Sequence, residues 1–261
     1  MPFTFAHPAA VLPLRRLKPL HLAALIVGSV TPDLPYYVPA KYARFFVDTH
    51  TAMGAIWLDI PLGMMTLLLG FLLRRPLVVL MTPRARSMCL ESMERFKEQP
   101  VNWLWAPLGI YVGVWTHLLW DSFTHDSGWL TRRVSALSAP VTIGSYTGTL
   151  CHTLQYVSSV AGLLILAIWY LRLRETSWEP PPQTASVQPS ARTAILLMIG
   201  TIAVAVGGFI AAHAAFGGAA LYRVFYLVLT RSIAWFVVLY VAAGSLILLS
   251  RRKLERSLSF E

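Results

Sequence analysis

Five apolar stretches of the sequence are each long enough, or nearly long enough, to cross the hydrocarbon core of a membrane. A helical crossing takes roughly 20 apolar residues. Backbone N–H and C=O groups cannot stay unpaired in lipid, so each stretch is expected to form an α-helix. The sequence therefore predicts an all-α, polytopic membrane bundle of five transmembrane helices, at about residues 52–73, 101–121, 153–171, 193–213 and 224–249.

The composition supports a membrane location and argues against a soluble domain that binds nucleic acid. Of the 261 residues, 56% are hydrophobic and only 13% are charged, whereas ordinary soluble domains carry about a quarter charged residues. The formal net charge is +10, but many basic residues lie beside the apolar stretches, as Arg74, Arg172 and Arg251 do. This placement is typical of cytoplasmic loops and of contact with anionic lipid headgroups. Membrane lipids are expected partners, and nucleic acid is not.

The basic residues also predict how the chain is oriented. Regions 74–100 and 172–192 and the tail from Arg251 carry many of the arginines. They fall on one side if the five helices alternate, and that side is then the cytoplasm. The chain is thus expected to be a multi-pass protein of the cytoplasmic membrane with a cytoplasmic C-terminus. Region 122–152 is expected on the outer side.

A shorter apolar run near the N-terminus, residues 20–31, is either a short span or a re-entrant element. Arg15, Arg16 and Lys18 before it favour a cytoplasmic N-terminus and a short span. Pro13 and Pro19 favour a broken path that does not cross. The side on which the N-terminus lies stays open.

One polar segment predicts the domain organisation. Residues 176–192 read TSWEPPPQTASVQPSAR and are rich in Pro, Ser and Thr, which is typical of a flexible linker. The segment separates a motif-bearing helical region, 1–175, from 193–261, which contains two further membrane helices and a basic tail.

Ionisable side chains within membrane helices are costly and are therefore candidates for function. With the predicted orientation, several of them converge toward the outer side. We expect four of these residues to bind a metal ion jointly: Asp33, His50, His117 and Asp121. Imidazole and carboxylate ligands without a thiolate suit Zn²⁺, Mn²⁺ or Fe²⁺.

The spacing in THLLWDSFTH, residues 116–125, shows which side chains could share an ion. His117 and Asp121 lie four residues apart, and hence on one helix face, about 5–6 Å apart at Cβ. His125 lies eight residues after His117, which is about 12 Å along a straight helix. Either the helix ends near Ser122, as the following Asp126-Ser127-Gly128 favours, or His125 serves a second ion or a catalytic role.

Asp59 lies nine residues after His50 and can share an ion with it only if the helix begins after His50. Asp59 could equally orient a ligand histidine or be a structural buried acid. Asp48 is expected to cap that helix. Structural interpretations also stay open for the other residues: a hydrogen-bonded His117–Asp121 pair, a turn residue at Asp33, an interfacial His50 and a loop residue at His125. We expect His21, His152 and His213 to be structural.

Four sequence blocks occur in an order that resembles a known family. They are MPFTFAHPAAVLPL, GSVTPDLPYY, DTHTAMGAIWLDIPLG and THLLWDSFTHDSGW, within residues 1–150. In this order they resemble the DUF4184 family of bacterial membrane proteins. They are more distantly similar to the YdjM-like inner-membrane proteins described as metal-dependent hydrolases. The resemblance implies a bacterial inner-membrane protein.

Carried over to this sequence, the presumed metal ligands of the YdjM-like pattern are His7, Asp33, His50, His117 and Asp121. Two features of that pattern are missing. It has a second acid after its Pro-Asp, where this chain has Pro35, and a longer histidine element, where this chain has only His50. Asp59 and His125 match the DUF4184 pattern, and we assign them provisional catalytic roles.

Two functions from different classes follow. The first is a metal-dependent hydrolase at the outer membrane face, acting on a phosphoester or lipid-linked substrate, with Arg132 and Arg133 available to hold a phosphate. The second is a non-enzymatic membrane scaffold or carrier with a structural metal ion or a buried His–Asp pair. The later helices contain almost no ionisable residues beyond His213 and Arg231, which argues against a carrier with a polar path across the membrane.

Overall fold

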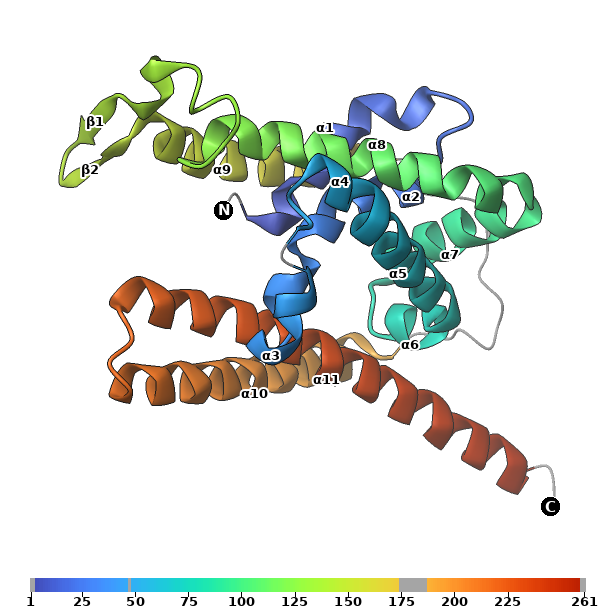
Figure 1. Ribbon diagram of the computed structural model, residues 1–261. Coiled ribbons are helices and arrows are strands. Elements are labelled where there is room, and N and C mark those ends of the chain that lie inside the picture. The colour runs from blue at the N-terminus through green and yellow to red at the C-terminus, as the bar shows by residue number, and fades with distance from the viewer. Residues whose placement is uncertain (1–2, 47, 174–186, 259–261) are drawn as a thin grey trace. The chain divides into compact units, whose positions relative to one another are not determined.

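Most of the chain is helical, as the apolar stretches predict. The computed structural model describes residues 3–46, 48–173 and 187–258 (Figure 1). The α-helices are α1 (Pro8–Val11), α2 (Leu22–Val30), α3 (Ala40–Ala43), α4 (Ala52–Gly54), α5 (Ile60–Leu72), α6 (Arg74–Val79), α7 (Pro83–Glu98), α8 (Val101–Thr124), α9 (Leu150–Arg172), α10 (Pro189–Phe216) and α11 (Leu221–Leu258).

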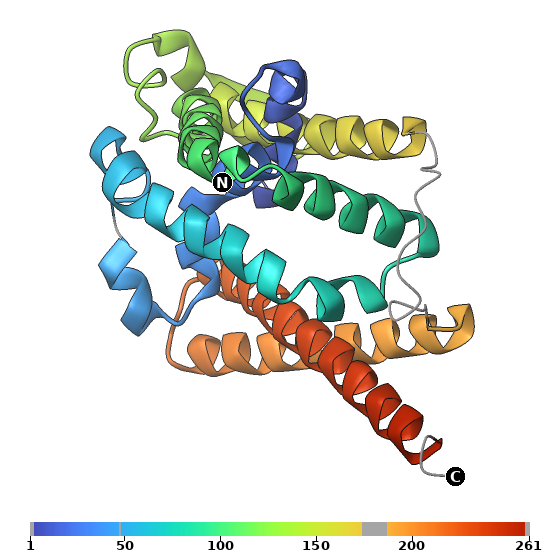
Figure 2. The ribbon, with the colours of Figure 1, turned by 90° about the vertical axis from the view of Figure 1, so that its right-hand side faces the viewer.

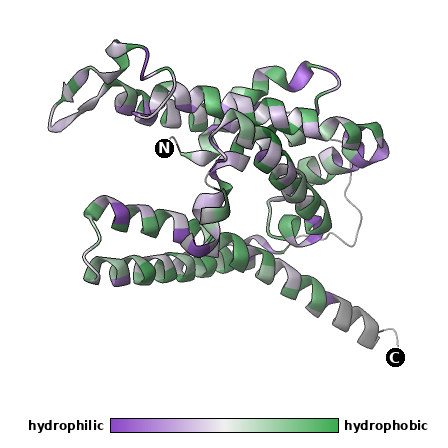
Figure 3. Cartoon of the chain, in the orientation of Figure 1, coloured by the Kyte–Doolittle hydropathy of each residue, from purple (hydrophilic) through white to green (hydrophobic). Residues whose placement is uncertain are grey.

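Four helical segments are long and apolar enough to cross a membrane: Ala52–Leu72, Leu150–Arg172, Pro189–Phe216 and Leu221–Arg251. Figure 3 shows the mainly hydrophobic colouring of α10 and of most of α11. Helix α8, which covers the predicted span 101–121, has 24 residues but is not among the four. The helix carries Asn102, His117 and Asp121, and these polar residues lower its mean hydropathy.

The segment Ala52–Leu72 is not one regular α-helix. Between α4 and α5 lies a π-helical turn, η5 (Ala55–Asp59). Pro61 has no N–H to donate to the carbonyl of Trp57 four residues earlier, so the regular hydrogen-bond pattern is interrupted at this point. Such π-turns occur frequently at functional sites. Asp59 is the last residue of this one.

A short β-hairpin joins α8 to α9, which the all-α prediction did not include. Strands β1 (Pro140–Ile143) and β2 (Tyr146–Thr149) pair antiparallel, with Ile143 opposite Tyr146. The loop is Gly144-Ser145, and Gly144 has a positive φ of 60°. A two-residue loop with glycine at this position suits the twist of a hairpin.

The contacts divide the chain into two compact units. The first unit comprises the described residues within 1–35, 41–68 and 96–174, and the second those within 36–40, 69–95 and 175–261. Residues 69–95 thus group with the C-terminal helices, a grouping that the linker at 176–192 did not predict. Of that linker, 176–186 lies outside the described residues, and 189–192 belongs to α10.

The second unit is built around a pair of long helices. Helix α11 runs back along α10 from the turn after Phe216 (Figure 2). The core of this unit contains Val79, Leu80 and Ile199. Residues of α10 and α11 pack against it, including Ile195 and Ile247. Tyr240 of α11 donates a hydrogen bond to the carbonyl of Leu77 at 3.0 Å.

The first unit depends on a close contact between α2 and α8. A Cβ added at Gly113 would overlap the backbone of Leu25 and Ser29, and one at Gly28 would overlap the backbone of Ile110. A Cβ at Gly109 would lie 2.8 Å from that of Ala24. Small residues four apart let two helix backbones approach closely in a membrane. The chain uses Gly109 and Gly113 in this way.

We predict that Gly113→Ala destabilises the protein by about 1–3 kcal/mol, because the new methyl group has no room against the backbone of α2. The matched control is Gly70→Ala in α5, where an added Cβ meets nothing within 4 Å. The control is expected to be neutral or slightly stabilising. Thermal unfolding in detergent measures both variants. Equal melting temperatures would show that the α2–α8 contact is not tight.

Candidate metal centre

Helix α8 presents two of the expected ligands on one face. His117 Nε2 lies 3.3 Å from Asp121 Oδ2, one helical turn away. Both side chains are buried, with 0% and 9% of their residue surface exposed. The helix ends at Thr124, two residues after Ser122, near which one of the two alternatives placed its end, and His125 is its C-cap.

Helix α2 fixes the orientation of the His117 ring. His117 Nδ1 lies 2.8 Å from the carbonyl oxygen of Ser29. A carbonyl oxygen only accepts, so Nδ1 carries the hydrogen and donates it. In the neutral ring the lone pair is then on Nε2, which faces the acidic residues. Metal-binding histidines commonly have this arrangement, with the second nitrogen donating to a carbonyl.

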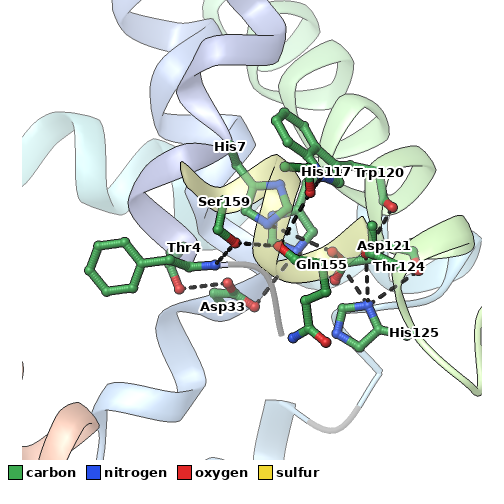
Figure 4. A network of polar contacts seen from close by, with 12 residues as sticks. Thr4, His7, Asp33, His117, Trp120, Asp121, Thr124, His125, Gln155 and Ser159 are labelled. Atoms are coloured by element: carbon green, nitrogen blue, oxygen red, sulfur yellow. Dashed lines mark hydrogen bonds and ion pairs between the residues drawn. The ribbon is translucent and has the colours of Figure 1, made fainter. Parts of the chain in front are cut away.

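Asp33 approaches from η3 (Thr31–Tyr37), the 3-10 helix that follows α2. The hydroxyl of Thr4 donates to Asp33 Oδ2 at 2.6 Å (Figure 4). The other oxygen, Oδ1, lies 3.6 Å from His117 Nε2 and 3.4 Å from His50 Nε2. Burial alone would raise the pKa of Asp33, but the nearby rings of His50 and His117 and the hydrogen bond from Thr4 lower it overall. The carboxylate is therefore held ionised.

His50 lies in the loop before α4, and the helix does begin after it. Thr51, not Asp48 as expected, is the N-cap, and its hydroxyl accepts from the N–H of Gly54 at 2.9 Å. The neighbouring hydroxyl of Thr49 donates to the carbonyl of Pro32 at 3.0 Å. This bond ties the loop to η3 and brings His50 Nε2 to 3.7 Å from Asp121 Oδ2.

His7, between η1 (Thr4–Ala6) and α1, completes the group. Its ring stacks on that of His117 with a centroid distance of 3.9 Å, and the ring of Trp120 lies against it at 5.3 Å. His7 Nε2 lies 3.7 Å from Asp121 Oδ1. Burial, together with the neighbouring His117, lowers the pKa of His7 to about 3. A neutral imidazole of this kind is the form that binds metals.

The five side chains form two groups of three that could each hold a metal ion, and His117 belongs to both. Donor atoms of His7, Asp33 and His117 lie within 4.8 Å of one another, as do those of His50, His117 and Asp121. The pairs between His and Asp are 3.3–3.7 Å apart, longer than a good hydrogen bond. Two ligands on a tetrahedral zinc ion, each at about 2.0–2.1 Å, are separated by about 3.3–3.4 Å.

Several buried nitrogen and oxygen atoms of these side chains have no hydrogen-bond partner within the described ranges. They are both ring nitrogens of His7, Nε2 of His117, Oδ1 of Asp33 and Oδ1 of Asp121. Buried polar groups are normally hydrogen-bonded, and leaving them unpaired costs free energy. An ion bound among them would satisfy one atom of each side chain that binds it.

Asp59 and His125, the residues expected to be catalytic, differ in burial. Asp59 is fully buried, and neither carboxylate oxygen has a hydrogen-bond partner in the described part of the chain. His125 lies at the edge, with 23% of its side chain exposed and Nδ1 at 3.7 Å from Asp121 Oδ1. Neither belongs to the two groups of converging ligands.

Arg132 and Arg133, considered for phosphate binding, are exposed. The guanidinium of Arg133 lies 4.2 Å from the centroid of the Trp129 ring, which is a cation–π contact. His21 has the structural role expected: its Nδ1 accepts from the N–H of Ala23 at the start of α2. His152 forms an exposed pair with Asp126 at 3.0 Å.

Three residues that position the ligands were not identified from the sequence. Thr4 holds Asp33, the carbonyl of Ser29 orients His117, and Trp120 packs against His7 and donates to Ser158 at 3.0 Å. Each of these residues is far in sequence from the ligand that it contacts. The only local signal is that Ser29 precedes Asp33 by four residues and Trp120 directly precedes Asp121.

The fold and this cluster define a class of protein: a helical, membrane-type protein with buried histidines and aspartates that could hold a metal ion. More specifically, the chain belongs to the family described as a domain of unknown function, DUF4184, whose model matches residues 1–249. No curated protein and no solved structure matches the chain.

We predict that the metal-free protein gains stability when Zn²⁺ or Mn²⁺ is added. At free metal about 100 times the dissociation constant, the gain is about 2.7 kcal/mol. Thermal unfolding in detergent, before and after treatment with a chelator, measures it. His117→Ala should abolish the gain, whereas His152→Ala, a histidine outside the cluster, should keep it. The cluster does not bind metal if both variants respond alike.

Proposed function

We propose that the protein is a membrane-bound, metal-dependent hydrolase whose metal ion is held by His7, Asp33, His50, His117 and Asp121. The observation that carries the proposal is the convergence of these side chains from separate segments. Their ligand atoms form two groups of three that share His117, and buried atoms of His7, His117 and Asp121 have no hydrogen-bond partner within the described residues. A structural hydrogen-bond network would instead pair these atoms directly with one another.

The ligand chemistry favours Zn²⁺, Mn²⁺ or Fe²⁺, since all donors are imidazole nitrogens and carboxylate oxygens. When bound, such an ion supplies Lewis acidity that polarises a phosphoryl or acyl oxygen and acidifies a water molecule. In hydrolysis of a phosphoester, the water oxygen bonds to phosphorus, and the ester oxygen leaves with a proton as an alcohol.

The chain's own residues assist in two ways. His125 is partly exposed beside Asp121, where it can exchange a proton between the site and solvent. Asp59 is buried and accepts no hydrogen bond from the described residues, so it can orient a polar group that enters the cluster. His50, with 28% of its side chain exposed, is a second partly exposed residue beside Asp121.

An apolar surface formed by Met53 and Trp57 favours a lipid-linked or phospholipid substrate. Met53 and Trp57 follow His50 in sequence and are 66% and 71% exposed. The indole N–H of Trp57 donates to the sulfur of Met53 at 3.1 Å, so the two side chains form one surface. Arg132 is exposed after the end of α8 and is available to hold a phosphate.

The proposed topology has α8 as a fifth membrane helix, because it is long enough to cross and its two ionisable residues, His117 and Asp121, are buried. Residues 20–31 form a short N-terminal element, and α2 within it has only nine residues. By the positive-inside rule, the C-terminus lies in the cytoplasm of a bacterial cell and the metal site lies toward the outer face of the inner membrane.

A structural metal ion is the second candidate function. The ligands come from four separate segments, and an ion would cross-link them whether or not any reaction occurs. A scaffold of this kind would bind metal without turnover. The partial exposure of His50 and His125 favours the hydrolase, because a structural site is normally closed.

We predict that alanine at His117 removes both metal and activity, whereas His125→Ala keeps the metal and lowers kcat by about 10²- to 10⁴-fold. Metal is measured by inductively coupled plasma mass spectrometry. Turnover is measured with bis(4-nitrophenyl) phosphate and with phospholipids in mixed micelles. His21→Ala is the control for loss of an imidazole. Stoichiometric metal without turnover of any substrate would favour the scaffold, and no metal would reject both.

A labelling experiment tests the proposed side of the membrane. Ser127 is exposed just after the metal-binding helix. In a variant with Ser127→Cys and both native cysteines replaced by alanine, a membrane-impermeant maleimide should label intact cells from outside. Labelling only in inverted vesicles would place this end of α8 in the cytoplasm and overturn the orientation.

A further inference from the structure

The second unit contains a buried arginine. Arg86, on α7, is only 6% exposed. Arg192 comes one turn before Ile195 on α10, and Arg251 comes one turn after Ile247 on α11. Ile195 and Ile247 pack against the apolar core of this unit, so both arginines lie one helical turn from residues that contact that core.

The guanidinium of Arg86 lacks the partners that a buried charge needs. Its Nε and Nη1 atoms have no hydrogen-bond partner in residues 3–46, 48–173 and 187–251. Burial, with the neighbouring charges of Arg251 and Arg192, lowers the pKa of Arg86. A buried cation that is repelled by its neighbours costs free energy unless an anion neutralises it.

The nearest acids on α7 are already paired elsewhere. Glu91 forms a salt bridge with Arg95, and Glu94 lies 3.9 Å from Arg74. These acids therefore do not neutralise Arg86. A bound anion that is not part of the described residues would neutralise Arg86. Its negative charge would also reduce the repulsion among Arg86, Arg192 and Arg251.

We propose that Arg86, with Arg192 and Arg251, binds a phosphate group, supplied by an anionic lipid headgroup or by free phosphate. Guanidinium groups bind phosphate through paired N–H donors, and a fork of this geometry favours phosphate over a compact anion. Arg251 is the last residue of the candidate span Leu221–Arg251, and Arg192 is the fourth residue of Pro189–Phe216. The site therefore lies at the boundary between hydrocarbon and headgroups.

The position of the site supports the lipid source. The positive-inside rule predicts the cytoplasmic side for these helix ends, and the cytoplasmic leaflet carries anionic lipids. The inference is independent of the metal site, because its residues belong to the second unit and share no ligand with the cluster. Either proposal can fail without affecting the other.

The test uses the full chain in dodecyl maltoside and follows thermal unfolding. Three probes are titrated separately: dioctanoyl phosphatidylglycerol, inorganic phosphate, and dioctanoylglycerol, which has the same chains without phosphate. We expect phosphatidylglycerol to raise the melting temperature and dioctanoylglycerol not to. Stabilisation by phosphatidylglycerol alone indicates a lipid-borne phosphate, and stabilisation by inorganic phosphate as well indicates that the free anion is also bound.

Matched arginine variants identify the site. Arg86→Gln should weaken phosphatidylglycerol binding by about tenfold or more, since it removes a charged donor pair. Arg95→Gln removes the same charge from an exposed position on the same helix and should leave binding unchanged. Arg192 is only partly buried, so Arg192→Gln should fold normally and still weaken binding. Equal effects of Arg86→Gln and Arg95→Gln, or equal stabilisation by dioctanoylglycerol, would overturn the proposal.

Discussion

The close contact between α2 and α8 is the constraint on which the cluster of histidines and aspartates depends. One stripe along α8, repeating every four residues, contains in order Gly109, Gly113, His117 and Asp121. The two glycines allow the backbone of α2 to approach, and the same approach brings the carbonyl of Ser29 to His117. A larger residue at Gly113 would move α2 outward, and His117 would lose the bond that orients it.

The same contact also places the first acid. Successive turns of α8 face successive positions along α2 and the residues after it. Gly109 faces Ala24, Gly113 faces Ser29, and one turn further His117 faces Asp33. Helix α2 ends at this point and continues as η3, in which Pro32 and Pro35 hold the chain in a tight 3-10 path. The short helix that was expected to span or re-enter the membrane thus carries a ligand to the middle of the first unit.

Several features could be predicted from the sequence because they are local. The four-residue spacing of His117 and Asp121 depends on helix geometry alone, and the end of α8 at Thr124 lies just before the turn residues Asp126-Ser127-Gly128. The contact between His7 and His117, and the bond from Thr4 to Asp33, join residues far apart in sequence and follow no local period. The hairpin at 140–149 could not be predicted, because strands of four residues are too short to show a clear alternation of polar and apolar residues.

The cluster also explains why a membrane-type helix can carry so many polar groups. A lone carboxylate or imidazole in the apolar part of α8 would cost several kcal/mol. His117 and Asp121 share their neighbours with Asp33 and His50, so opposite charges and donors face one another. Their separations of 3.3–3.7 Å nevertheless leave the pairing incomplete. A divalent ion bound there would offset this residual cost, so the metal binding proposed above would be coupled to the stability of the first unit.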